Sequence, residues 1–320
     1  MQTTSLDTTV SATIPATPFT PYRTALDVVH EGIQAGQLNS ALDGLFDSLS
    51  LRREDDPEAW PEFAQSCLRH PLRHILHQDP FTYRAFSKPR GYAGDAVMMD
   101  YIYGLGDAAR AGQEATPIGR AIFRHMGTRP SARAVRYRRQ LLAELIDRTA
   151  TRGGSRVFAL AAGHLREVEM SAAVRAGRLE HFVAMDQDQA SLAVVDRDYR
   201  EFGVLPVSGS VRQILSGKVN LAHFDFVYAA GLFDYLAPPV ATALTSRLFD
   251  MLRPGGTLLI PNFAAGAADT GYMEAFMDWH LIYRTHDDMQ ALAAPLAGVR
   301  SVDVFDDDDA TITFLLVNKQ

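Results

Sequence analysis

Five short apolar runs between residues 157 and 263 constrain the fold of this chain more than any other feature. The runs cover residues 157–163, 181–186, 204–210, 224–231 and 252–260, and stretches with helical character separate them. Strands that alternate with helices form a parallel sheet with crossovers. The sequence therefore predicts an α/β domain in which the strands place their carboxyl ends at one edge of the sheet.

A glycine turn after the first run and an acid at the end of the second indicate a nucleoside site at that edge. Asp186 lies 23 residues after Gly163, close to the offset of about 20 residues for a ribose-binding acid. A dinucleotide turn would carry several glycines that face a pyrophosphate. The turn at 161–167 has one glycine, and Glu167 would repel a diphosphate. The residues favour a nucleoside that has no phosphate.

On the Gly163 turn, Asp186, and the segments 208–212, 224–231 and 252–256, the chain resembles the class I S-adenosylmethionine-dependent methyltransferases. The resemblance implies a Rossmann-like, seven-stranded methyltransferase sheet, and S-adenosylmethionine as methyl donor or as the substrate itself. The first motif departs from the family pattern, with Ala159, Ala161 and His164 where an acid and glycines are common. The residues expected to bind the cofactor are Ala161, Gly163, Glu167, Asp186, Gln187, Gly209, Ser210, Val211, Ala230 and Gly231.

A narrower resemblance rests on segments 88–95, 99–103, 231–236 and 271–284. These segments are similar to a bacterial group labelled for biosynthesis of a hydroxypalmitic acid methyl ester. That group is similar to enzymes of specialised metabolism, including enzymes that cyclise S-adenosylmethionine to azetidine-2-carboxylate. The resemblance implies a small-molecule substrate.

The first half of the chain is expected to be helical, over residues 22–37, 38–51, 57–78, 96–103, 117–129 and 131–149. A flexible turn at 152–155 marks a boundary. We therefore predict an all-helical lid and substrate domain at 21–150 and the cofactor-binding domain at 151–320. Residues 88–103 are expected to form the inner surface of the lid; the alternative is a tight turn followed by core tyrosines.

Candidate chemical groups follow the strands and the aromatic segments. Aromatic faces can hold a sulfonium, and Asp234 can accept a proton or cap a helix. Five arginines between 129 and 139 form a solvated face unless one of them turns inward to a carboxylate. The catalytic candidates are Tyr92, Asp234, Tyr235, Asn262 and Tyr283. The substrate-binding candidates are Asp95, Arg133, Tyr137, Phe233, Tyr272, Trp279 and Arg284.

Composition narrows the class of protein. A net charge of −7 argues against a nucleic-acid surface, and no apolar run is long enough to span a bilayer. Residues 1–20 lack Lys and Arg, which predicts a disordered tail on a cytoplasmic protein. The single cysteine, Cys67, excludes an internal disulfide. The ten histidines are scattered and show no spacing typical of metal ligands. The acidic run 306–309 is expected to be the turn of a hairpin.

Three functions remain open from the sequence. The first is methyl transfer to a small nucleophile, an amino acid or acyl compound. The alternative is intramolecular cyclisation of S-adenosylmethionine, with release of 5′-methylthioadenosine. A non-catalytic S-adenosylmethionine-binding protein is the third. The sequence leaves open whether the chain forms a homodimer.

Overall fold

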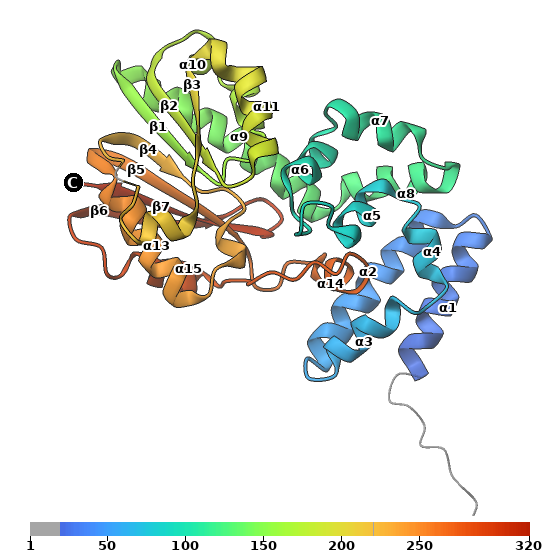
Figure 1. The fold of residues 1–320 in the computed structure, drawn as a ribbon. Coiled ribbons are helices and arrows are strands. Elements are labelled where there is room, and N and C mark those ends of the chain that lie inside the picture. Colours follow the sequence, from blue (N-terminus) through green and yellow to red (C-terminus); the bar gives the residue numbers. More distant parts are fainter. Residues whose placement is uncertain (1–19, 220) are drawn as a thin grey trace, which may run out of the picture.

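The computed structural model describes residues 20–219 and 221–320, and it contains a seven-stranded sheet in the order β3-β2-β1-β4-β5-β7-β6 (Figure 1). Strands β1 to β5 pair in parallel, and β7 runs antiparallel to both β5 and β6. The strands are β1 (Ser155–Leu160), β2 (Leu179–Asp186), β3 (Val204–Ser208), β4 (Phe224–Tyr228), β5 (Leu252–Phe263), β6 (Val299–Asp306) and β7 (Ile312–Lys319). The expected α/β sheet and terminal hairpin are confirmed.

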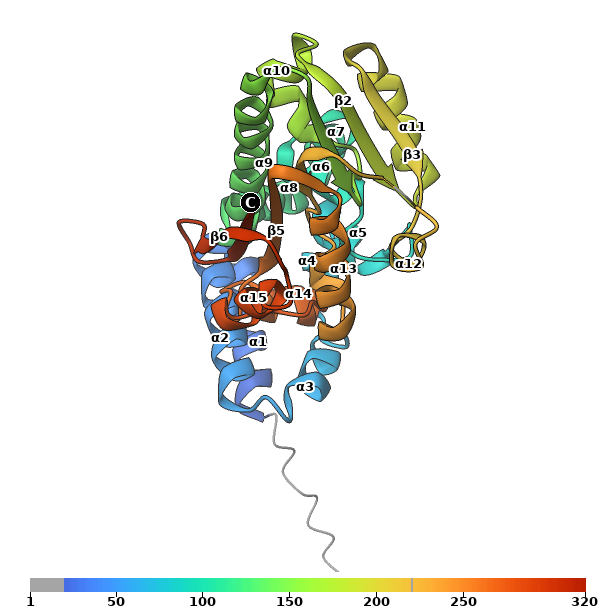
Figure 2. The ribbon, with the colours of Figure 1, turned by 90° about the vertical axis from the view of Figure 1, so that its left-hand side faces the viewer.

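Nine helices precede the sheet in the described part of the chain, and they gather on one side of it (Figures 1 and 2). They are α1 (Thr20–Gln34), α2 (Leu38–Asp55), α3 (Trp60–Cys67), α4 (Leu72–Leu76), α5 (Pro80–Ser87), α6 (Ala96–Tyr103), α7 (Gly106–Glu114), α8 (Pro117–Thr128) and α9 (Pro130–Thr149). The single helix expected over 57–78 is divided, because Pro71 has no amide hydrogen to continue it. The tail expected at 1–20 lies outside the described residues except for Thr20.

Helices and short 3-10 turns connect the strands. They are η1 (Ala150–Arg152), η2 (Arg166–Met170), α10 (Ala172–Arg175), α11 (Gln189–Tyr199), η3 (Arg200–Phe202), α12 (Val211–Leu215), η4 (Phe233–Tyr235), α13 (Pro238–Asp250), α14 (Thr270–Phe276) and α15 (His286–Ala293). The helical stretch expected after the first strand consists of a 3-10 turn, η2, and a four-residue helix, α10. Over both described ranges, no helix is long and apolar enough to cross a bilayer.

Alternate residues of the central strands pack into two apolar cores. Val157 and Ala159 of β1 join a core that continues into the N-terminal helices, whereas Phe158 and Leu160 face α13 and α15. This alternation follows from the two-residue period of a strand. One face of the sheet and the N-terminal helices are thus held together by a shared core.

Helix α14 comes from the second half of the chain but lies among the N-terminal helices, beside α2 and α3 (Figure 1). A Cβ at Gly271 would lie 2.9 Å from the backbone carbon of Leu49, so only glycine permits this approach. Glu274, which is buried, accepts hydrogen bonds from Trp60 Nε1 at 2.5 Å and Arg53 Nε at 3.1 Å. The N-terminal helical group is therefore completed by residues near position 270.

Candidate functional site

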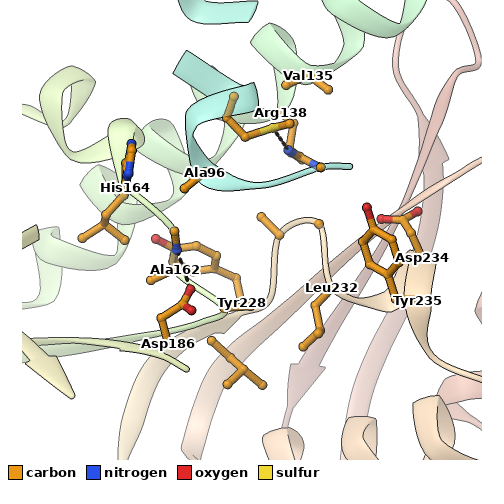
Figure 3. Close-up of a pocket in the computed structure, with 18 of the residues that line it drawn as sticks. Ala96, Val135, Arg138, Ala162, His164, Asp186, Tyr228, Leu232, Asp234 and Tyr235 are labelled. Atoms are coloured by element: carbon orange, nitrogen blue, oxygen red, sulfur yellow. Dashed lines mark hydrogen bonds between the residues drawn. The ribbon is translucent and has the colours of Figure 1, made fainter. Parts of the chain in front are cut away.

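A cavity of about 400 Å³ lies at the carboxyl ends of β1, β2 and β4, and α6 and α9 cover it (Figure 3). All the residues expected to bind the cofactor line this cavity. Among the other candidates, Tyr92, Asp234, Tyr235 and Trp279 also line it. The edge of the sheet predicted from the sequence therefore carries a cavity that the N-terminal helices partly cover.

Asp186 fixes the turn after β1. Its Oδ2 accepts a hydrogen bond from the Gly163 amide at 2.8 Å, and its Oδ1 accepts one from the Asp188 amide at 2.8 Å. Gly163 has a φ of 55°, in the left-handed region that favours glycine. The carboxylate is held rigidly at the cavity wall, and each oxygen keeps a lone pair for a further donor.

Glu167 is buried against Tyr228, whose hydroxyl donates a hydrogen bond to Glu167 Oε1 at 2.6 Å. Burial raises the pKa of Glu167, against the smaller lowering effect of the Tyr228 hydrogen bond and the charge of Arg138. Glu167 belongs to η2, which is only five residues long. This wall therefore lacks the long α-helix whose amino terminus would bind a phosphate.

Asp100 ties α6 to the turn after β1. It pairs with His164 Nδ1 at 2.8 Å and accepts Arg166 Nε at 2.8 Å. Burial tends to raise the pKa of Asp100, but the hydrogen bonds and charges of His164 and Arg166 hold it below its usual range. The helix above the cavity and the turn below it are thus joined by a buried charged network.

An aromatic wall joins the loop before α6 to the loops after β4 and α14. Trp279 Nε1 donates a hydrogen bond to the Tyr235 hydroxyl at 2.9 Å. A Cβ at Gly94 would lie 2.6 Å from that hydroxyl, so glycine is required for this contact. Burial, followed by the charges of Asp186 and Asp95, raises the pKa of Tyr92 to about 12. Tyr92 therefore stays a neutral phenol at physiological pH.

Asp234 lies on the opposite side of the cavity from Asp186 (Figure 3). It is 3% exposed, and its Oδ1 accepts the Phe263 amide at 2.6 Å. Burial raises the pKa of Asp234. Its side chain caps no helix, because it bonds to the end of β5. A buried carboxyl with a raised pKa is suited to proton transfer.

Asn262, Phe233 and Arg284 lie outside the cavity lining and hold the loop after β4. Arg284 donates to the Phe233 carbonyl at 2.7 Å and to the Leu236 carbonyl at 2.6 Å, and it also donates to Asn262 Oδ1. The Phe233 side chain is fully buried in the core beneath α13. None of these three residues lines the cavity, and the Arg284 guanidinium is engaged by two backbone carbonyls and the Asn262 amide oxygen instead of facing the cavity.

The remaining candidates are also placed away from the cavity. Arg133 pairs with Asp309 on the surface at 2.7 Å, and Tyr137 packs edge-on against Phe314. Asp95 caps α6 by accepting the Met98 amide, and it pairs with Arg84.

Tyr272 and Tyr283 belong to the packing around α14. Tyr272 stacks on Phe46 with ring centroids 4.6 Å apart, and the Tyr283 ring lies under Arg53. The aromatic residues between 272 and 283 recur at helical spacing, but α14 ends at Phe276 and Asp278 has a φ of 48°. Because the chain leaves the helix there, only Trp279 of this segment's candidates reaches the cavity.

Arg138 and His164 line the cavity but are absent from the candidates drawn from the sequence. Arg138 belongs to the basic stretch 129–139, and helical spacing alone does not identify which of its five arginines points inward. His164 stands in the sequence as a departure from the family motif, with no signal that places it in the cavity. In the parts of the chain described, no three His, Cys, Asp or Glu side chains gather as metal ligands would.

No family model matches the chain, and no curated protein gives a significant match. A solved structure of a possible exported protein from Bordetella parapertussis is similar to it, with a TM-score of 0.57, 17% identity, and coverage of 70% of this chain and 79% of that chain. The N-methyltransferase NodS from Bradyrhizobium japonicum WM9, in complex with S-adenosylhomocysteine, aligns with a TM-score of 0.44 and 13% identity over 60% of this chain and 89% of its own. 1,6-Didemethyltoxoflavin-N1-methyltransferase from Burkholderia thailandensis aligns with a TM-score of 0.42 and 17% identity, over 57% of this chain and 78% of its own.

The strand order, with β7 antiparallel between β5 and β6, defines the class of fold. It is the seven-stranded, Rossmann-like sheet of the class I methyltransferases. The resemblance drawn from the sequence motifs is confirmed at the level of this fold.

Proposed function

We propose that the protein transfers a methyl group from S-adenosylmethionine to a small-molecule nucleophile, an amino acid or acyl compound of specialised metabolism. The observation that carries the proposal is the rigid Asp186 carboxylate beside the Gly163 turn, inside a partly covered cavity at the carboxyl edge of the sheet. An acid at this place binds ribose hydroxyls in Rossmann-like folds.

The cavity residues fit this cofactor. Asp186 would accept hydrogen bonds from the ribose hydroxyls. Gly209, which lines the cavity, packs closely on Met185, where a Cβ would lie 2.8 Å from Met185 Sδ. The lining also lacks the long phosphate-binding helix that a dinucleotide needs. When bound, S-adenosylmethionine supplies a methyl group on a positively charged sulfur.

The chain's own groups would align the reactants and exclude water. Tyr92, Tyr235 and Trp279 would face the positive charge with aromatic rings. Asp234, with its pKa raised by burial, would accept a proton from an amine or hydroxyl nucleophile. We also propose that residues 21–150 act as a lid, because α6 and α9 close the cavity from above.

Cyclisation of S-adenosylmethionine to azetidine-2-carboxylate is the second candidate. It is favoured by the size of the cavity, about 400 Å³, which is near the lower end of the range of about 300–1,000 Å³ for small-molecule sites. In this reaction the α-amine attacks the side-chain carbon next to sulfur, and 5′-methylthioadenosine leaves with the electron pair of the broken bond. The reaction needs no second substrate.

Mass spectrometry separates the two functions. Purified protein is incubated with S-adenosylmethionine alone, and then with added pools of amino acids and acyl compounds. We expect S-adenosylhomocysteine only when an acceptor is present. If S-adenosylmethionine alone yields 5′-methylthioadenosine and azetidine-2-carboxylate above the uncatalysed background, the protein is a cyclase and not a methyltransferase. Tight binding without either product would mean a non-catalytic binding protein.

A further inference from the structure

Arg138 of α9 is a charged cavity residue to which the proposed function gives no role. It is only 5% exposed, and it lines the cavity. Its partners are uncharged: Nη2 donates to Met99 Sδ at 3.5 Å, and the guanidinium also hydrogen-bonds with the Tyr103 side chain. Within the described ranges it forms no ion pair with a carboxylate.

The other arginines of α9 all have oxygen partners. Arg133 and Arg139 pair with carboxylates, and Arg136 donates to two backbone carbonyls. A buried guanidinium without a counter-ion is unfavourable. Arg138 therefore indicates an anionic group that arrives with the ligand.

Arg138 and Gly231 lie next to each other in the cavity lining, and the φ of 81° at Gly231 is in the left-handed region that favours glycine. A Cβ at Gly231 would lie 3.6 Å from Arg138 Nη1 and 3.9 Å from Nη2. Arg138 reaches from α9 toward this loop after β4 (Figure 3). A carboxylate in this space would meet the guanidinium and could bind it through two parallel hydrogen bonds.

The acids around Arg138 restrict the charge of the ligand. Glu167 and Asp234 line the same cavity. Burial raises the pKa of each, and the positive charge of Arg138 opposes this effect at both. Arg138 offers a positive charge that matches a carboxylate, and the acids Glu167 and Asp234 offer partners for an ammonium group, so an amino-acid moiety suits this part of the cavity.

We propose that Arg138 binds the carboxylate of an amino-acid moiety next to Gly231, and so joins the lid to the ligand. The inference rests on the proposed function, in which Asp186 binds the nucleoside. Asp186 ends β2, Gly231 follows β4, and β1 lies between them. The carboxylate site and the ribose site are thus separate parts of one cavity, two strands apart. The carboxylate belongs either to the amino-acid tail of the donor or to an amino-acid acceptor.

Calorimetric titration of two probes tests the assignment. S-adenosylhomocysteine carries the amino-acid tail, whereas 5′-methylthioadenosine keeps the nucleoside and lacks that tail. We expect Arg138→Met to weaken S-adenosylhomocysteine binding about 10- to 100-fold, with little change for 5′-methylthioadenosine. Arg138→Lys keeps the positive charge and should lose less affinity for S-adenosylhomocysteine than Arg138→Met does. Arg133→Met, on the same helix but paired at the surface, is the matched control and should bind both probes normally.

A second arm identifies the source of the carboxylate. If Arg138→Met and Arg138→Lys bind S-adenosylhomocysteine normally, L-amino acids are titrated into wild type and variants saturated with it. Loss of this binding in the variants would assign the carboxylate to the acceptor. Unchanged binding in both arms would overturn the role of Arg138 and leave the proposed function standing. If the wild-type protein binds neither S-adenosylhomocysteine nor 5′-methylthioadenosine, both the role of Arg138 and the proposed function are wrong.

Discussion

At the scale of single residues, Asp186 combines two tasks that are usually separate. Its two oxygens hold the backbone amides of Gly163 and Asp188, so the carboxylate shapes the turn against which a nucleoside would pack. The lone pairs that remain on these oxygens would accept hydrogen bonds from ribose hydroxyls. Removal of this side chain should therefore affect binding through both the lost contacts and the turn.

We expect Asp186→Ala to weaken S-adenosylhomocysteine binding about 10- to 100-fold, because hydrogen bonds to a charged acceptor are lost. Calorimetric titration measures this change, and a thermal melt confirms that the variant is folded. Asp196→Ala provides the control, since Asp196 pairs with Arg200 on the exposed side of α11. Normal affinity in a folded Asp186→Ala protein would contradict the nucleoside site.

The positions of Gly163 and Asp186 in the cavity lining were predictable because their sequence signal is local. A glycine turn, a strand and an acid at the expected spacing place Gly163 and Asp186 together wherever the rest of the chain lies. Arg138 differs, since the direction in which it points depends on how α9 is rotated against the sheet. The five arginines between 129 and 139 point in different directions around the helix, and only the packing of α9 on the sheet decides which one faces the cavity.

At the scale of elements, helix ends explain most of the differences from the sequence-based prediction. Aromatic residues at 272–283 keep helical spacing beyond Phe276, where α14 ends. Spacing identifies a potential stripe but does not report where the chain turns left-handed, as it does at Asp278. By contrast, Ala96–Tyr103 is predicted with the observed bounds, because Asp95 is a strong N-cap and Gly104 a favoured C-cap.

Helix α5 begins with a buried acid that makes stability depend on pH. Asp79 accepts the Phe81 and Thr82 amides, but burial dominates and raises its pKa to about 6. The folded state therefore keeps the proton until about pH 6, whereas the unfolded chain releases it near 4. Between these values the unfolded state binds fewer protons, so stability falls as pH rises, by up to about 3 kcal/mol.

Urea unfolding between pH 4 and 7.5 measures this contribution. Asp79→Asn keeps an N-capping side chain but cannot ionise, so its free energy of unfolding should lack the fall attributed to Asp79. Asp55→Asn, at an exposed position at the end of α2, should retain the wild-type pH profile. Identical pH profiles for wild type and Asp79→Asn would show that Asp79 does not titrate in this window.

At the scale of the whole molecule, the N-terminal helices and the sheet share one apolar core, and α14 fixes their association. The helical group is assembled from two distant parts of the sequence, so its integrity depends on residues near position 270. The sequence predicts that the first half of the chain is helical and that the second half is an α/β sheet. It does not predict that α14 of the second half packs on α2 of the first, because no local pattern indicates this long-range contact.

Glu274→Ala tests the attachment of α14. The change leaves the Trp60 indole N–H without its acceptor and Arg53 without its counter-ion, with an expected loss of about 2–4 kcal/mol in the free energy of unfolding. Urea denaturation followed by tryptophan fluorescence measures it. Glu54→Ala, at an exposed position of α2, should change stability little. A similar effect for both variants would mean that the buried contact does not anchor α14.

The path of α14 also sets an order for synthesis of the protein. Helices α1 to α9 leave the ribosome long before residues 270–276 are made. During that time Trp60 and Leu49 lack the contacts that α14 makes with them in the complete protein. Domains that fold as units during translation need no such delay. Here a nascent chain arrested before residue 270 should expose apolar surface to chaperones, and one released beyond 276 should close it.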